Sequence, residues 1–203
     1  AVFSLGELPK MCVNSFLRRR KNTNFISMKI DWRHSSPEEF QSFCNALLWL
    51  EIDHSFEGFE ATGKDGGIDG LYNGKYGKRT GTWRFQYKYH STARKVAFQS
   101  LKKDVVSEIE KIKNEDHLVL LTNVPISPQE KVTIRELIIA ALQKADKSHM
   151  SVELWDGAKI NRLYLKFPLL KLWLEEGFSS ASLIPYRQGF QDRLDAPSSN
   201  LNT

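Results

Sequence analysis

Three residues in the middle of the chain have the types and spacing needed for hydrolysis at a phosphate. Asp69 ends the run GKDGGID, and Gln86 and Lys88 lie two residues apart in the segment TWRFQYKYH. A carboxylate and an amide oxygen are hard ligands of the kind that Mg²⁺ prefers. An ammonium group can orient a water molecule and offset the negative charge that develops on phosphorus. If the three side chains meet, they predict a Mg²⁺ site, with Mn²⁺ as the alternative ion, that cleaves phosphodiester bonds.

Two further groups are candidate ligands of the same ion. The main-chain carbonyl of Tyr87 lies between Gln86 and Lys88, and the carboxylate of Glu60 precedes the turn that leads to Asp69. Glu60 can equally be an exposed carboxylate at the end of a strand. Asp65 belongs to an Asp-Gly pair, which is typical of turns, and we interpret it in that way, with an outer role at the site as the alternative.

The segment TWRFQYKYH predicts the strand that carries these groups. Its aromatic residues alternate with a polar row of Arg84, Gln86, Lys88 and His90, so the two kinds occupy opposite faces. A solvent-facing row on an edge strand is the competing interpretation, because isolated Gln-x-Lys pairs are common. Arg84 and His90 are candidates for phosphate contacts, with an ordinary surface position as the alternative. Asn-Gly at the start of NGKYGKRTG predicts a hairpin that pairs this strand with GIDGLYN and brings Asp69 beside Gln86.

The elements around this hairpin predict a sheet between two layers of helices. SSPEEF opens a helix expected over residues 36–53, and SPQE opens another at Ser127, each with a serine cap followed by proline and glutamate. A long charged helix is expected over about 92–114, and HLVLLTNV has the continuous apolar pattern of a central strand. MSVELW predicts another strand, followed by a helix that Asp156 caps. The order helix, three strands, helix, strand, helix, strand, helix predicts the α/β class, as an α/β/α sandwich with a central mixed sheet.

Charge is unevenly distributed along the chain. The formal net charge of +5 is carried by residues 1–30, so the rest of the chain sums to zero. Eight acids and one base between residues 38 and 69 are followed by nine bases and no acid between residues 71 and 103. This pattern suits a metal site beside a phosphate-binding surface, whereas ordinary solvated faces are the alternative. The candidates for backbone contacts with double-stranded DNA in the basic block are Lys75, Lys78, Arg79, Arg94 and Lys95.

Composition predicts one soluble domain with tails. We expect a basic N-terminal arm at 1–30, a catalytic domain at 31–178 and a linker or the start of a further domain at 179–203. No run of 18 apolar residues exists, so no membrane partner is expected, and the N-terminus lacks the pattern of a secretory signal. Cys12 and Cys44 make neither a disulfide framework nor a zinc motif. Together these features predict a cytoplasmic protein.

At the site residues the chain resembles the Mrr-like branch of the PD-(D/E)XK nuclease superfamily, which has the restriction-endonuclease-like fold. The resemblance is carried by GKDGGIDG followed by FQYK, since that branch has a Gly-Gly-Ile-Asp strand before a Gln-x-Lys strand. EEFQSFCNALL, LVLLTNVPIS and VELWDGAKINRLYLKFP are similar to its first helix, a later strand and turn, and its terminal strand and helix, so the resemblance covers about residues 36–174. It implies a Mg²⁺-dependent DNA endonuclease with Asp69, Gln86 and Lys88 at the active site.

The chain departs from the family pattern in its first helix. Many relatives carry a glutamate directly after the phenylalanine that corresponds to Phe40, and this chain has Gln41 there. The helix-borne acid is therefore unassigned, with Glu39, Glu51 and Glu60 as the candidates to replace it.

The resemblance also implies a biological setting, namely restriction or antiphage defence. Cleavage of both DNA strands requires two active sites, so a homo-oligomer is expected when the protein is active. Mrr-like domains occur in modification-dependent restriction enzymes and as N-terminal effectors of antiviral STAND NTPases, and the second arrangement implies a C-terminal NTPase or sensor domain. Two other functions remain open: a non-catalytic nucleic-acid-binding module on the same fold, which the departure at Gln41 favours, and a junction-resolving nuclease.

Overall fold

The computed structural model describes residues 30–32, 35–53, 55–59, 68–167 and 170. Its elements follow the predicted order, and their bounds are α2 (Pro37–Glu51), β1 (Glu57–Gly58), β2 (Gly70–Tyr76), β3 (Arg79–Lys88), α3 (Arg94–Lys111), β4 (His117–Thr122), α4 (Pro128–Lys144), β5 (Ser151–Trp155) and α5 (Gly157–Lys166). The predicted basic arm, apart from Ile30, and the predicted linker at 179–203 lie outside the described residues. Among the described helices, none is long and apolar enough to cross a membrane.

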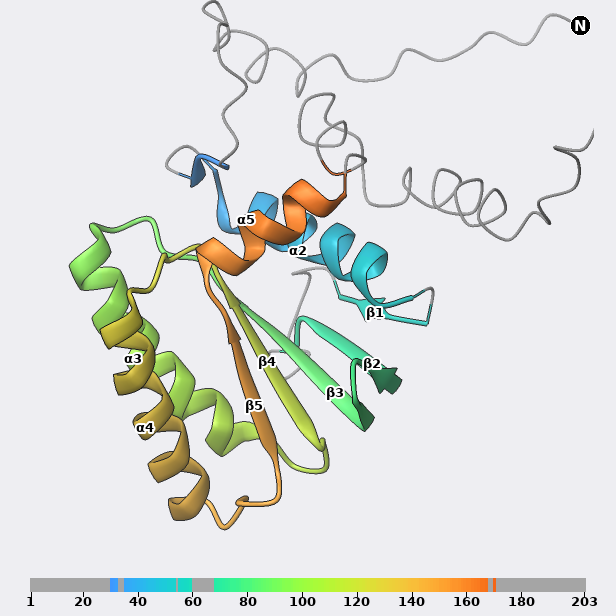
Figure 1. Ribbon diagram of the computed structural model, residues 1–203, viewed down its shortest axis with the longest axis vertical. Coiled ribbons are helices and arrows are strands. Elements are labelled where there is room, and N and C mark those ends of the chain that lie inside the picture. Colours follow the sequence, from blue (N-terminus) through green and yellow to red (C-terminus); the bar gives the residue numbers. More distant parts are fainter. Residues whose placement is uncertain (1–29, 33–34, 54, 60–67, 168–169, 171–203) are drawn as a thin grey trace, which may run out of the picture.

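The five strands form one mixed sheet in the order β1-β2-β3-β4-β5. β1, β2 and β3 pair antiparallel, whereas β4 runs parallel to β3 and β5 runs parallel to β4. Figure 1 shows α2 and α5 on one side of the sheet and α3 and α4 on the other. The predicted α/β/α sandwich is therefore confirmed.

Each face of the sheet has its own hydrophobic core. Trp83, Phe85 and Tyr87 of β3 pack toward α2 and α5 in a cluster rich in aromatic rings. Leu118 and Leu120 of β4 pack toward α3 and α4 on the opposite face. All six residues of β4 are buried, as the continuous apolar run predicts, because helices cover both sides of this strand.

The helices begin where the sequence predicts. Ser36 and Ser127 each accept a hydrogen bond from the backbone of the glutamate three residues later, and each glutamate side chain returns a bond to the serine backbone. These capping boxes satisfy amide groups that the first turn leaves without partners. Asp156 caps α5 by accepting from the Lys159 N–H at 2.9 Å. The caps fix the ends of α2 and α5 on the aromatic face of the sheet.

The predicted hairpin forms, but its turn is shorter than the predicted link at residues 73–81. The turn consists of Gly77 and Lys78, and Gly77 has a φ of +62°, a left-handed conformation that glycine adopts without strain. Asn73 and Gly74 instead lie within β2, where Gly74 pairs with Gly81. A side chain at Gly74 would meet the Tyr72 hydroxyl at 2.5 Å. The glycine at this position therefore serves the close approach of Tyr72 and does not form the turn.

Truncation of one buried side chain on each face of β4 tests the two hydrophobic cores. We expect Leu120→Ala and Leu121→Ala each to lower the free energy of unfolding by about 3 kcal/mol, since both side chains are fully buried and leave a cavity. Val132→Ala on the exposed side of α4 is the matched control and should change it by no more than about 0.5 kcal/mol. Urea denaturation followed by circular dichroism measures all three. A leucine variant as stable as the control would contradict a packed core on that face.

Candidate active site

Asp69 and Gln86 meet at the carboxyl end of β3, as the predicted hairpin requires. Asp69 directly precedes β2, and its backbone N–H donates to the carbonyl of Phe85 at 3.3 Å. Its carboxylate oxygen Oδ2 accepts hydrogen bonds from the Tyr87 N–H at 2.7 Å and from the Gln86 amide nitrogen. The side chain of Asp69 is thus held by the strand that carries the other candidate residues.

The main-chain carbonyl of Tyr87 faces the same side of β3 as Asp69. In an extended strand, the N–H and C=O of one residue point toward the same neighbouring strand. Since the Tyr87 N–H donates to Asp69, its carbonyl points to this edge and away from β4. This orientation fits the predicted use of the carbonyl as a ligand.

The amide of Gln86 is oriented less favourably for the predicted metal site. Its nitrogen donates to Asp69, and its oxygen accepts from Nη2 of Arg84 at 3.4 Å. The amide must turn over before its oxygen can lie beside the Asp69 carboxylate, and that rotation removes the acceptor from Arg84. The Asp69 carboxylate and the Tyr87 carbonyl are oxygen donors of the kind that a hard cation prefers, whereas Gln86 would offer its oxygen only after this rotation.

No cluster of three or more histidine, cysteine, aspartate or glutamate side chains that could hold a metal ion occurs among the described residues. The predicted donor set relies instead on one carboxylate, one amide and one main-chain carbonyl. The fourth candidate ligand, Glu60, lies outside the described residues, as does Asp65.

A pocket of about 380 Å³ joins the candidate residues. Asp69 lines it from the start of β2, Lys88 and His90 from the end of β3, Gln41 from α2 and Asp104 from α3. Lys88 was predicted to face this site, and the structure places it in the same pocket as Asp69. Asp69 and Lys88 therefore both line one space that is open to ligands.

Gln41, which the resemblance aligns with an acid of the Mrr-like nucleases, lines the pocket and is already hydrogen bonded. Its amide nitrogen donates to the carbonyl of Phe59 at 2.7 Å, close to the point where the chain approaches Asp69. The proposed substitutes on α2 lie elsewhere. Glu39 belongs to the capping box of α2, and Glu51 binds the hydroxyl of Tyr76 and the ammonium of Lys166 at the other end of the helix. Neither glutamate replaces the missing acid.

The polar row of β3 is covered by α3 and does not face solvent along its length. Arg84 and Gln86 are each only 4% exposed, so the solvent-facing row is contradicted. The guanidinium group of Arg84 lies 3.6 Å from Glu108 and 3.5 Å from Glu115. A phosphate contact by Arg84, expected from the sequence, does not fit this buried position.

Glu108 is the site residue that the sequence reasoning missed. It is 1% exposed on α3, and its carboxylate accepts hydrogen bonds from Lys88 at 2.8 Å and from Lys111 at 2.9 Å. The burial raises the pKa of Glu108, but the hydrogen bonds and charges of the two lysines outweigh burial and lower the pKa below its usual value. The sequence did contain a signal that Glu108 is buried, because it follows Leu101 and Val105 at the spacing of the apolar stripe.

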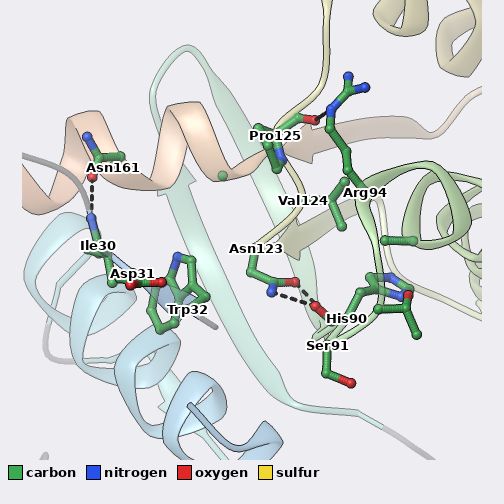
Figure 2. Close-up of a pocket in the computed structure, with 13 residues that line it drawn as sticks. Ile30, Asp31, Trp32, His90, Ser91, Arg94, Asn123, Val124, Pro125 and Asn161 are labelled. Carbon is green, nitrogen blue, oxygen red and sulfur yellow. Dashed lines mark hydrogen bonds between the residues drawn. The ribbon is translucent and has the colours of Figure 1, made fainter. Parts of the chain in front are cut away.

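His90 lines both the candidate pocket and a second pocket of about 440 Å³. Its imidazole Nε2 is 3.4 Å from the Asp104 carboxylate, and its side chain is 10% exposed. Figure 2 shows how Asn123, which directly follows β4, fixes the backbone of His90 through two hydrogen bonds of 2.9 Å. The surface position considered for His90 is therefore replaced by a partly buried one beside an acid. Asn123 is a structural residue that no motif indicated.

The predicted DNA contacts fall on opposite ends of the sheet. Lys75, Lys78 and Arg79 are exposed on the β2–β3 hairpin, at the amino end of β3. Lys95 is exposed in the first turn of α3, which follows the carboxyl end of β3. At about 3.3 Å per residue, the ten residues of β3 separate the two groups by about 30 Å. The basic block thus forms two surfaces and not one.

Arg94 borders the second pocket, and its guanidinium group already has protein partners. Its guanidinium group donates to the carbonyl of Pro125 at 3.3 Å, an arrangement visible in Figure 2, and forms an ion pair with Glu130. A phosphate contact by Arg94 would compete with Glu130, whereas Lys95 has no acidic partner among the residues that the structure describes.

Comparison with known proteins gives a sequence match to a much longer protein. A stretch of 113 residues, 55% of this chain, is 30% identical to the "Uncharacterized protein y4cD" of Sinorhizobium fredii (strain NBRC 101917 / NGR234). The chain spans 16% of the length of that relative. No protein-family model and no solved structure matches the chain.

The environment of His90 predicts its titration. Burial lowers the pKa of His90 below 6.5, Asp104 opposes this shift and Lys88 adds to it. We expect an NMR titration midpoint below 6.5 and a further decrease in Asp104→Asn. Because the folded state favours neutral imidazole, this group should reduce the stability of the fold as pH decreases through its unfolded value.

His90→Gln assigns the signal in that titration. A midpoint above 6.5 in the wild-type protein would contradict the dominance of burial and would indicate a charged pair with Asp104.

Proposed function

We propose that the protein is a Mg²⁺-dependent DNA endonuclease, with Mn²⁺ as the alternative ion, and that its active site is the pocket at the carboxyl end of β3. The observation that carries this proposal is the convergence of Asp69 and Lys88 on one pocket beside Gln86 and the Tyr87 carbonyl. The resemblance of GGID and QYK to the Mrr-like nucleases supports it.

Each residue has a defined part in the proposed chemistry. Asp69, the Tyr87 carbonyl and, after rotation of its amide, Gln86 would hold the ion, which supplies a Lewis acid for the phosphodiester. Lys88 would orient the attacking water and offset charge on the pentacovalent phosphate. The two hydrogen bonds to Asp69 keep its carboxylate in place before substrate arrives.

The biological setting is part of the same proposal. We propose a cytoplasmic nuclease that acts against foreign DNA, as a homo-oligomer so that two sites can cut both strands. A place within a larger protein, with a C-terminal NTPase or sensor domain, fits the match to a relative of which this chain spans 16%. An NTPase phosphate-binding loop in the full-length protein would support the antiviral effector arrangement over a restriction enzyme.

A non-catalytic nucleic-acid-binding module is the second candidate. It is favoured by Gln41, which places an amide where many relatives carry an acid, and by the ion pair that occupies Lys88. This alternative predicts DNA binding that is insensitive to Mg²⁺ and no cleavage at any protein concentration. A junction-resolving nuclease would instead cleave branched DNA in preference to linear duplex.

Plasmid nicking tests the proposed active site. We expect Mg²⁺-dependent conversion of supercoiled to open-circular DNA that EDTA abolishes. Asp69→Ala and Lys88→Ala should each lower the rate by roughly 100-fold or more, because each removes a group that stabilises the transition state. Lys144→Ala, which removes an exposed lysine on α4, is the control and should retain the wild-type rate.

Equal purity and circular-dichroism spectra establish that the variants are comparable. Undiminished nicking by Asp69→Ala or Lys88→Ala would refute the assignment of the site.

The salt dependence of DNA binding tests which basic surface contacts the duplex. Lys95 lies near the proposed site, whereas Lys78 lies at the far end of β3. We expect Lys95→Ala to weaken binding and to reduce the slope of log K against log salt by about 1, as loss of one phosphate contact requires. Fluorescence anisotropy with a labelled duplex in Ca²⁺ measures both variants. A larger effect of Lys78→Ala would indicate that the hairpin makes the main contact with the DNA backbone.

A further inference from the structure

The interface between α3 and β3 contains a carboxylate that the proposed chemistry does not use. Glu108 is buried, yet three cations surround it: Lys88 and Lys111 bind Oε1 at 2.8 and 2.9 Å, and Arg84 lies 3.6 Å from Oε2. A buried carboxylate of this kind persists only when it is paired, because burial otherwise removes its hydration without compensation. Glu108 and its partners therefore form one unit.

The unit extends along β3 beyond Lys88. Arg84 contacts Glu108 on one side and Glu115 on the other, and it also donates to the Gln86 amide oxygen at 3.4 Å. Gln86 in turn donates to Asp69. A continuous series of polar contacts thus connects the two ends of the candidate site, from Lys88 through Glu108 and Arg84 to Gln86 and Asp69.

Compensation of the buried Arg84 charge accounts for an acid at this position, but not for the further hydrogen bond that its carboxylate accepts from Lys88. Buried ion pairs can often be replaced by apolar residues of similar volume without loss of stability. Leu101, Val105 and Ile109 show that α3 uses such residues at the neighbouring buried positions. The distinguishing effect of Glu108 is local, since it fixes a long and flexible lysine side chain whose base lies on β3 and whose surface borders the pocket.

We propose that Glu108 is the positioning residue of the active site, which holds the ammonium group of Lys88 at the edge of the pocket; this role rests on the proposed nuclease function. An ammonium group has three hydrogen-bond donors, and one of them is bound to Glu108. Two donors remain for water and phosphate oxygens. Orientation before substrate binding lowers the barrier of the chemical step, because the ordering cost is not incurred during the reaction.

The two lysines that share Oε1 differ in their surroundings. The side chain of Lys88 is 21% exposed and lines the pocket, whereas that of Lys111 is 49% exposed and reaches Glu108 from one helical turn away. Lys111 screens the carboxylate, and Lys88 is the group that Glu108 orients. Loss of Lys111 should therefore leave the position of Lys88 intact.

Two readouts on the full chain test this role. Glu108→Gln keeps the shape of the side chain but removes its charge, and we expect kcat for plasmid nicking to decrease by about 100-fold, as for a misplaced catalytic group, with KM unchanged. The rate at which an amine-reactive acetylating reagent modifies Lys88, followed by mass spectrometry, should increase several-fold because the amine is no longer held. Glu110→Gln, an exposed acid on the same helix, should change neither quantity.

The labelling readout does not depend on catalysis, so the two proposals can fail separately. Absence of nicking by the wild-type protein refutes the nuclease, and unchanged labelling of Lys88 in Glu108→Gln refutes the positioning role. An equal decrease in nicking by Glu110→Gln would also refute it.

Lys111→Gln covers the case in which Glu108→Gln fails to fold. We expect this variant to retain both nicking and the protection of Lys88. Loss of both would show that the whole charged network, and not Glu108, holds the lysine.

Discussion

Glu108 meets Lys88 and Arg84 in the interface between α3 and the sheet, and this match of charges is what allows the helix to cover β3. Without Glu108 and Glu115, Arg84 would carry an uncompensated charge into the interior. With the carboxylate in place, the aliphatic parts of the basic side chains can pack beneath α3 beside Leu101 and Val105. The same ion pairing fixes the position of the Lys88 ammonium group. That position determines where positive charge lies relative to the pocket. Fold and candidate site therefore share one electrostatic requirement.

The two faces of β3 position different groups of the candidate site. On the aromatic face, Tyr87 is anchored through its hydroxyl group to Asn45 of α2 at 2.6 Å. Its backbone on the same strand binds the Asp69 carboxylate. Rigid packing on one face thus fixes the direction of polar groups at the strand edge, and the ion pairs of the other face fix the long side chains. A single strand supplies both kinds of support.

Much of this arrangement could be predicted from the sequence, and the misses have identifiable causes. The capping serines and the apolar run of β4 gave the elements and their order, because these signals depend on neighbouring residues alone. Alternation in β3 separated its two faces correctly but could not show that the polar face is covered, since that depends on the charge of a distant helix. The link of the hairpin was predicted too long because Asn-Gly favours a turn by itself, whereas pairing of Gly74 with Gly81 extends the strands to Gly77. Glu108 was missed because an acid in an amphipathic helix is normally assigned to its solvated side.

The separation between the hairpin and the candidate site has a consequence for the size of the substrate. About 30 Å along β3 is close to one turn of B-form DNA, which measures about 34 Å. A duplex that spanned the molecule from the hairpin to the pocket would present the same groove to Lys78 at one end and to the pocket at the other. If the proposed nuclease holds one duplex at both basic surfaces, a substrate shorter than about ten base pairs would reach only one of them.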